Sequence, residues 1–182
     1  VCLESSALNT IMAINKTVLY NKYRPKTLAQ VSQPHVVKVL NKQIEKRQHP
    51  SVYLLEGPPG VGKTTIARIV CAAMSCKQLT DSFEPCGECT TCQSIFEDRF
   101  RELNEVNCAT NGGVDDIRAM ISEKMYIMPS QGDKRFFILD EAHMLTTAAQ
   151  NALLKIMEEP PDYVIFFLCS SEAHKIVPAI RS

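Results

Sequence analysis

The sequence predicts an α/β fold in which a parallel β-sheet is covered by helices on both faces. Residues 136–139 and 164–168 are apolar throughout, as expected of strands buried on both faces. Segments with helical periodicity lie between such runs. Residues 52–55 form a further apolar run, and a Gly-rich turn joins it to one of the helical segments. Apolar strands that alternate with helices are typical of parallel sheets, because crossover helices cover both faces.

The first half of the chain contributes a helix, a strand and a second helix. Residues 36–47 allow an amphipathic helix that ends before Pro50; its apolar residues are Val36, Val37, Val39, Leu40 and Ile44. Residues 52–55 form a short apolar strand. Residues 63–74 form the next helix, with apolar residues at helical spacing: Ile66, Ile69, Val70 and Ala73. Residues 76–92 show little periodicity of either kind.

The second half continues the alternation. Residues 102–106 are expected to form a strand, and residues 114–128 a helix that ends before Pro129 and faces inward through Val114, Ile117, Ile121, Met125 and Met128. Residues 135–139 form the next strand. Residues 146–158 form a helix with Ala149, Ala152, Leu153 and Ile156 inward, and residues 164–168 the last predicted strand.

Composition and charge narrow the class of protein. Of 182 residues, 45% are hydrophobic and 22% charged, which excludes a disordered or collagen-like chain. Lys and Arg (20) balance Asp and Glu (20), which argues against a broad basic surface for nucleic acid or anionic membranes. No segment resembles a signal peptide, and the longest apolar stretch, residues 163–169, is too short to span a membrane. A cytoplasmic, reducing setting is therefore expected.

A phosphate-binding motif lies between the first strand and the second helix. Residues 57–64 read GPPGVGKT and match G-x-x-x-x-G-K-[ST] in full. The loop backbone and the helix N-terminus are expected to surround phosphate oxygens, with Lys63 reaching the β- and γ-phosphates and Thr64 ligating Mg²⁺. The candidate nucleotide-binding residues here are Gly57, Pro58, Pro59, Gly60, Val61, Gly62, Lys63, Thr64 and Thr65.

Two carboxylates follow the strand at residues 135–139. Asp140 and Glu141 would lie at the carboxyl end of the sheet, where α/β proteins bind ligands. We expect Asp140 to face the metal beside Thr64, and Glu141 to activate the water that attacks the γ-phosphate. Residues 140–143 also spell DEAH, the box of a helicase class, but the cysteine-rich segment upstream argues against that class. His143 is therefore expected to be a packing or capping residue.

Four of the eight cysteines are spaced as metal ligands. Cys76, Cys86, Cys89 and Cys92 follow the pattern C-x9-C-x2-C-x2-C, which favours a structural, tetrahedral Zn²⁺ site in a reducing compartment. An iron–sulfur cluster, disulfides and free thiols are the alternatives. Cys71, Cys108 and Cys169 are expected to be small buried hydrophobic residues.

Together these motifs resemble the clamp-loader ATPases of the AAA+ class. The resemblance covers about residues 18–182 and rests on Tyr23-Arg24-Pro25, GPPGVGKTT, the four cysteines, DEAHML, and the run from NALLK to MEEPP at residues 151–161. It implies a P-loop NTPase (AAA+) three-layer sandwich, with a zinc module inserted at about residues 75–93 and an N-terminal extension, native or not, at residues 1–17. It also implies that the last strand and the helical lid are absent from this fragment, so that residues 52–55 form a sheet edge.

The resemblance implies further roles for individual residues. Arg24, Pro25 and Val31 are candidates to lie against the adenine, and Ser171 is placed as a sensor within reach of the γ-phosphate, where the family usually has Thr. The family also uses an arginine directly after the position of Ser182, which acts in trans on the neighbouring subunit; Arg181 is not that residue.

The implied function is that of an ATPase subunit of a DNA polymerase clamp loader. With ATP, Mg²⁺ and Zn²⁺ as cofactors, it would work in a hetero-oligomeric ring that loads the sliding clamp at primer–template DNA. Lys155 could face DNA, although its position equally suits a solvated lysine. The alternatives are a non-hydrolysing structural subunit of the same complex and another AAA+ DNA motor, such as a branch-migration helicase. The isolated fragment is expected to bind nucleotide weakly and to hydrolyse it poorly.

Overall fold

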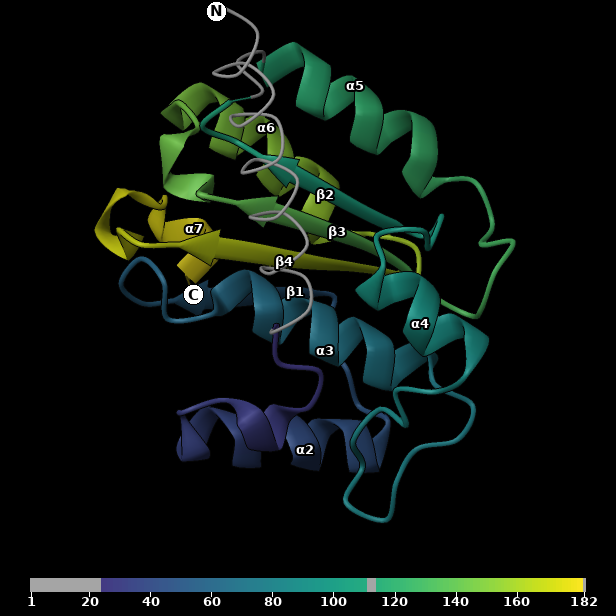
Figure 1. Cartoon of the computed structure of the whole chain (residues 1–182). Coiled ribbons are helices and arrows are strands. Elements are labelled where there is room, and N and C mark those ends of the chain that lie inside the picture. The colour runs from purple at the N-terminus through teal and green to yellow at the C-terminus, as the bar shows by residue number, and fades with distance from the viewer. Residues whose placement is uncertain (1–23, 111–113, 182) are drawn as a thin grey trace, which may run out of the picture.

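The computed structural model describes residues 24–110 and 114–181, which form a four-stranded parallel sheet with helices on both faces (Figure 1). The strand order is β1-β4-β3-β2, so β1 and β2 are the edges of the described sheet. The strands are β1 (Val52–Glu56), β2 (Leu103–Asn107), β3 (Arg135–Asp140) and β4 (Val164–Ser170). The predicted extension, Tyr23, residues 111–113 and Ser182 lie outside the described residues.

Alternate residues of the two central strands face two separate cores. On β3, Phe136 and Ile138 point to one face of the sheet, and Phe137 and Leu139 to the other. The first face is covered by α3 (Lys63–Ser75) and α4 (Thr90–Phe96), and α2 (Pro34–Lys46) packs against α3 (Figure 1). The second face is covered by α5 (Val114–Met125) and α6 (Thr147–Glu158). The predicted α/β class and three-layer architecture are thus confirmed.

The remaining elements are short. They are the 3-10 helices η1 (Leu28–Gln30), η2 (Ala142–Met144) and η3 (Ala173–Lys175), and the helix α7 (Pro178–Arg181). In the described part of the chain, no helix is long and apolar enough to cross a membrane.

Local sequence signals explain where the longer helices begin and end. Pro34 opens α2, where its missing N–H has no helical partner to lose, and Arg47 ends that helix in the left-handed conformation. Thr146 caps α6 by accepting a hydrogen bond from the Ala149 N–H at 3.3 Å. The predicted helix at residues 146–158 therefore begins one residue later, directly after its cap.

Three sequence expectations about the helices need correction. The helix predicted to reach residue 128 ends at Met125, and Met128, expected on its inner face, is 71% exposed. Val39 is likewise exposed rather than inward. α4 begins at Thr90, inside a segment that shows no periodicity, because Cys89 caps it: the Cys89 sulfur accepts the Cys92 N–H at 3.4 Å.

A buried carboxylate joins β2, β3 and the loop after α5. Glu102 is 1% exposed; it accepts hydrogen bonds from the Ser130 N–H (2.8 Å), the Ser130 hydroxyl (2.9 Å) and the Gln131 N–H (3.3 Å), and it pairs with the Arg135 guanidinium. Burial alone would raise the pKa of Glu102, but the bonds from Ser130 and Arg135 outweigh it and hold the pKa below its ordinary value.

Candidate functional site

The loop between β1 and α3 has the backbone geometry of an anion-binding turn. Gly60 (φ 80°) and Gly62 (φ 94°) adopt left-handed conformations that residues with a Cβ rarely take. Gly62 caps α3, and its carbonyl accepts the Ile66 N–H at 2.8 Å. The loop therefore leads directly into the N-terminus of a 13-residue helix, where free N–H groups and the helix dipole favour a negatively charged ligand.

Lys63 places a positive charge against this loop. Its side chain is buried, and Nζ donates hydrogen bonds to the Gly57 carbonyl at 2.9 Å and to the Pro58 carbonyl at 3.2 Å. The Gly57 N–H in turn donates to the Ser170 carbonyl at 3.2 Å, so β4 anchors the start of the loop. The ammonium group is thus held beside the turn, where it can contact an anion bound there.

A cavity of about 420 Å³ opens beside the loop. One wall consists of Gly60, Val61, Gly62, Lys63, Thr64 and Thr65, and the facing segment supplies Pro25, Gln30, Val31 and Ser32. Asp140 and Glu141 complete the lining. This volume lies within the roughly 300–1,000 Å³ usual for small-molecule sites.

Most of the predicted nucleotide-binding residues meet at this cavity, with four exceptions. Gly57, Pro58 and Pro59 belong to the loop but do not line the cavity. Arg24 also lies outside the lining, and its Nε donates to the Thr65 hydroxyl at 3.1 Å. Sequence reasoning missed Gln30 and Ser32, since single polar residues beside a 3-10 turn carry no motif.

The carboxylates form a hydrogen-bonded group at the ends of β3 and β4. Glu141 follows β3 in a left-handed conformation (φ 53°), and its N–H donates to the Asp140 carboxylate at 3.1 Å. The Glu141 carboxylate accepts a hydrogen bond from the Ser171 hydroxyl at 2.9 Å. Two residues predicted to act on the γ-phosphate therefore contact each other.

His143 lies at the back of this group. Its buried ring approaches the Glu141 carboxylate (Nδ1 to Oε2, 3.3 Å), the Glu172 carboxylate (Nε2 to Oε1, 3.5 Å) and the Ser170 hydroxyl (Nδ1 to Oγ, 3.4 Å). The ring thus packs between the loops that follow β3 and β4, a position that agrees with the expected packing role.

The oxygen atoms expected to hold Mg²⁺ are present on the same cavity. Thr64 and Asp140 both line it, and a hydroxyl with a carboxylate is a ligand set that suits this cation. Burial, reinforced by the negative charge of Asp140, raises the pKa of the Cys169 thiol to about 12. Burial raises the pKa of Cys108 to the same value and that of Cys71 well above its usual range. All three are buried, as predicted.

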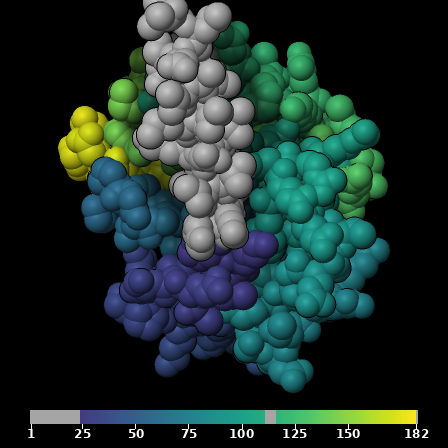
Figure 2. Space-filling view, viewed as in Figure 1, coloured from purple at the N-terminus to yellow at the C-terminus, as the bar shows by residue number. Residues whose placement is uncertain are grey.

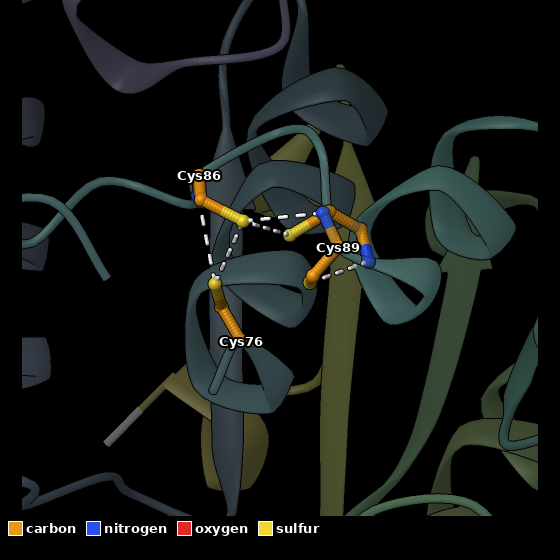
Figure 3. Close-up of side chains that lie close together, drawn as sticks. Cys76, Cys86 and Cys89 are labelled. Atoms are coloured by element: carbon orange, nitrogen blue, oxygen red, sulfur yellow. Dashed lines mark hydrogen bonds between the residues drawn. The ribbon is translucent and has the colours of Figure 1, made fainter. Parts of the chain in front are cut away.

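The four predicted metal ligands converge at the far end of α3. The sulfur atoms of Cys76, Cys86, Cys89 and Cys92 all lie within 4.8 Å of one another, and Cys76, Cys86 and Cys89 are labelled in Figure 3. The Cys76–Cys86 sulfur separation is 3.5 Å and the Cys86–Cys92 separation 3.9 Å. A zinc ion with four sulfurs at about 2.3 Å in a tetrahedron sets its ligands about 3.8 Å apart. The cluster therefore fits a single tetrahedral ion.

Backbone donors and sulfur separations favour the metal over the alternatives. The Cys86 sulfur accepts the Cys89 N–H at 3.4 Å, which lowers the pKa of the Cys86 thiol to about 7, whereas burial raises the pKa of Cys92. The separations are too long for disulfide bonds, which are about 2.05 Å. A multi-iron cluster spreads its cysteines over several metal atoms, and four sulfurs this close leave no room for that.

Comparisons with known proteins agree with these features. The family described as "DNA polymerase III, delta subunit" matches residues 32–182. The chain is 42% identical over 167 residues to DNA polymerase III subunit gamma/tau of Mycobacterium tuberculosis (strain ATCC 25618 / H37Rv), a match that covers 90% of the chain and 28% of that relative.

Two solved structures from Thermotoga maritima share the fold at low identity. A DNA polymerase III gamma subunit-related protein matches with a TM-score of 0.56 at 21% identity, over 79% of this chain and 42% of that protein. A RuvB variant matches with a TM-score of 0.56 at 22% identity, over 87% of this chain and 45% of that protein. The chain thus spans between about a quarter and a half of the length of the proteins it matches.

Proposed function

Because the chain belongs to the DNA polymerase III delta-subunit family, we propose that it is the nucleotide-binding part of a clamp-loader ATPase, a gamma/tau-type subunit of DNA polymerase III. The observation that carries the proposal is the single cavity whose lining brings Lys63, Thr64, Asp140 and Glu141 together. These residues are the ammonium, hydroxyl and carboxylate groups that phosphoryl transfer requires.

Each of these residues has a distinct part in ATP binding. The loop at residues 57–62 and the N-terminus of α3 bind the phosphates, while Lys63 turns from the loop carbonyls toward the β- and γ-phosphate oxygens. Thr64 and Asp140 would hold Mg²⁺, which would supply positive charge to neutralise the phosphates. Pro25 and Val31 give the base an apolar surface on the opposite wall.

Hydrolysis depends on the carboxylate group described above. Glu141 accepts the proton of the attacking water, and Ser171 orients the Glu141 carboxylate through their 2.9 Å hydrogen bond. The site stays competent only while β3 and β4 hold their carboxyl ends side by side, because Glu141 directly follows β3 and Ser171 directly follows β4.

The wider role follows from the relatives. We infer that the protein works in the cytoplasm within a ring of clamp-loader subunits, in which ATP promotes binding to the sliding clamp and to primed DNA, and hydrolysis releases both. The cysteine module holds Zn²⁺, and this zinc is structural rather than catalytic, because four sulfur ligands leave no open position on the metal. Alone, the protein would bind nucleotide weakly and turn it over slowly.

A substitution at Glu141 tests the proposal. In the protein assembled with its partner subunits, Glu141→Gln should lower ATP turnover about 10²–10⁴-fold, while the dissociation constant of a fluorescent ATP analogue changes little. Asp116→Asn, which alters an exposed carboxylate on α5, is the matched control. Turnover that persists in Glu141→Gln would contradict the assigned role. A parent protein that binds ATP without any turnover would favour the non-hydrolysing subunit.

A further inference from the structure

A buried glutamate connects the cysteine module to the segment that forms one wall of the cavity. Glu84 lies between Cys76 and Cys86 in the chain and is 6% exposed. Its carboxylate accepts the Leu28 N–H at 2.7 Å and the Ala29 N–H at 3.1 Å, more than fifty residues away in the sequence. These N–H groups open the 3-10 helix η1, whose own N-cap residue, Thr27, makes no side-chain cap hydrogen bond. Glu84 thus serves as the cap of η1.

The segment held by Glu84 is the one that faces the phosphate loop. Pro25 precedes η1, Gln30 is its last residue, and Val31 and Ser32 follow it; all four line the cavity. Leu28 is fully buried in the core that also contains Cys92. The position of this wall therefore depends on where the Glu84 carboxylate lies.

The position of Glu84 depends in turn on the loop between the cysteines. The Glu84 N–H donates to the Thr80 hydroxyl at 3.1 Å, and the Thr80 N–H donates to the Glu84 carbonyl at 3.0 Å. Cys76 and Cys86, whose sulfurs are 3.5 Å apart, close the two ends of this loop. A metal ion that binds both sulfurs would fix the loop, while without it no covalent or coordinate bond joins its ends.

A second contact joins the same two parts of the molecule. Lys26 Nζ lies 5.9 Å from the centre of the Phe96 ring on α4, the helix that carries Cys92. Figure 2 shows the first described residues, in purple, in contact with the neighbouring teal surface of the part of the chain that includes the cysteine module.

We propose that Glu84 is a positioning residue through which the metal-loaded cysteine module sets the cavity wall opposite the phosphate loop, so that loss of the metal weakens nucleotide binding through Glu84. The proposal rests on the nucleotide-binding function proposed above. Two N–H groups bonded to one buried carboxylate hold the wall before the nucleotide arrives, and losing such pre-organisation should weaken binding by roughly tenfold.

The test compares Glu84→Ala with Asp81→Ala, which removes an exposed carboxylate from the same loop. Nucleotide affinity is measured with a fluorescent ATP analogue, before and after the metal is removed with a chelator. In the parent and in Asp81→Ala, metal removal should weaken binding about tenfold. Glu84→Ala should show that loss already with metal bound, and metal removal should add little to it.

A second probe separates a displaced wall from a general loss of folding. Inorganic tripolyphosphate lacks the base that we propose rests on Pro25 and Val31, so its competition with the fluorescent analogue should be unchanged in Glu84→Ala. If the alanine variant does not fold, Glu84→Gln, which keeps one acceptor oxygen, should give an intermediate loss of affinity. The proposal would be overturned if metal removal and Glu84→Ala reduced nucleotide affinity additively. It would also be overturned if they weakened the binding of tripolyphosphate as strongly as the binding of ATP. A parent that binds no ATP would instead refute the proposed function.

Discussion

The contribution of the metal to stability can be isolated by comparing two cysteines that are equally buried. Cys92 and Cys71 are both 0% exposed, both lie on helices, and both belong to the same core. Only Cys92 is a member of the four-sulfur cluster. Replacing either residue with alanine removes one sulfur atom from the core, at a cost of about 1 kcal/mol for the small cavity. The difference between the two variants therefore reports the metal–ligand interaction.

The expected difference follows from the number of ligands. A structural zinc site contributes about 10–16 kcal/mol of apparent binding free energy, or roughly 2.5–4 kcal/mol for each of four thiolates. For a domain of this size, 1 kcal/mol shifts the melting temperature by about 2–4 °C. Cys92→Ala should therefore melt about 5–15 °C below Cys71→Ala when both are prepared with zinc.

Thermal unfolding with and without a chelator, together with metal analysis, measures this difference. The parent and Cys71→Ala should hold one zinc per chain and lose stability when chelated. Cys92→Ala keeps three of the four ligands, so it should bind zinc more weakly and release it at a lower chelator concentration than Cys71→Ala. Equal melting temperatures for the two zinc-treated variants would refute the reasoning, and iron with visible absorption would refute the assignment of zinc.

Three further predictions concern the carboxylates and the glycine loop. The lowered pKa of Glu102, where accepted hydrogen bonds outweigh the effect of burial, means that its stabilisation is complete above the ordinary carboxyl pKa and is lost as pH falls through the lowered value. Glu102→Gln should thus lower the free energy of unfolding, measured with denaturant, by about 3 kcal/mol at pH 7 and by progressively less in acid. A loss of stability that does not change with pH would exclude this explanation. Ser171→Ala removes the hydrogen-bond donor to Glu141 and should slow ATP turnover roughly ten- to hundredfold without weakening ATP binding. A loss of ATP affinity instead would show that Ser171 contributes to binding. Gly62→Ala and Gly132→Ala impose similar backbone strain, because φ is 94° and 82°, so each should lower the free energy of unfolding by about 1–2 kcal/mol. Only Gly62→Ala should weaken ATP binding in a fluorescence titration. Equal effects of the two variants on binding would show that strain alone is responsible.

The sequence predicted those features that depend on short-range patterns. The four strands lie within two residues of their predicted bounds, and apolar runs of four or more residues marked β1, β3 and β4. The phosphate loop and the cysteine spacing were equally readable, because their chemistry requires fixed residue types at fixed intervals. The predicted relationship to DNA polymerase III subunits is confirmed by the family match.

Contacts between distant residues could not be predicted in this way. Glu84 is an ordinary acidic residue in an aperiodic loop, and only the fold brings it to the N–H groups of Leu28 and Ala29. The sequence indicated one inward face for α3, yet residues 65–73 are all buried, because the sheet, α2 and α4 surround the helix. Such burial depends on how elements pack, which the periodicity of one segment does not contain.

The strand order also determines when the phosphate loop can form during synthesis. Within the described sheet β1 pairs only with β4, and the Gly57 N–H needs the Ser170 carbonyl. At about 5–20 residues per second, a ribosome that has passed the loop needs roughly 5–20 s to reach the end of β4. Throughout that interval the nascent chain exposes β1 without its partner, and nucleotide cannot assist its folding. Chaperones that bind apolar strands would therefore act on this protein before ATP can.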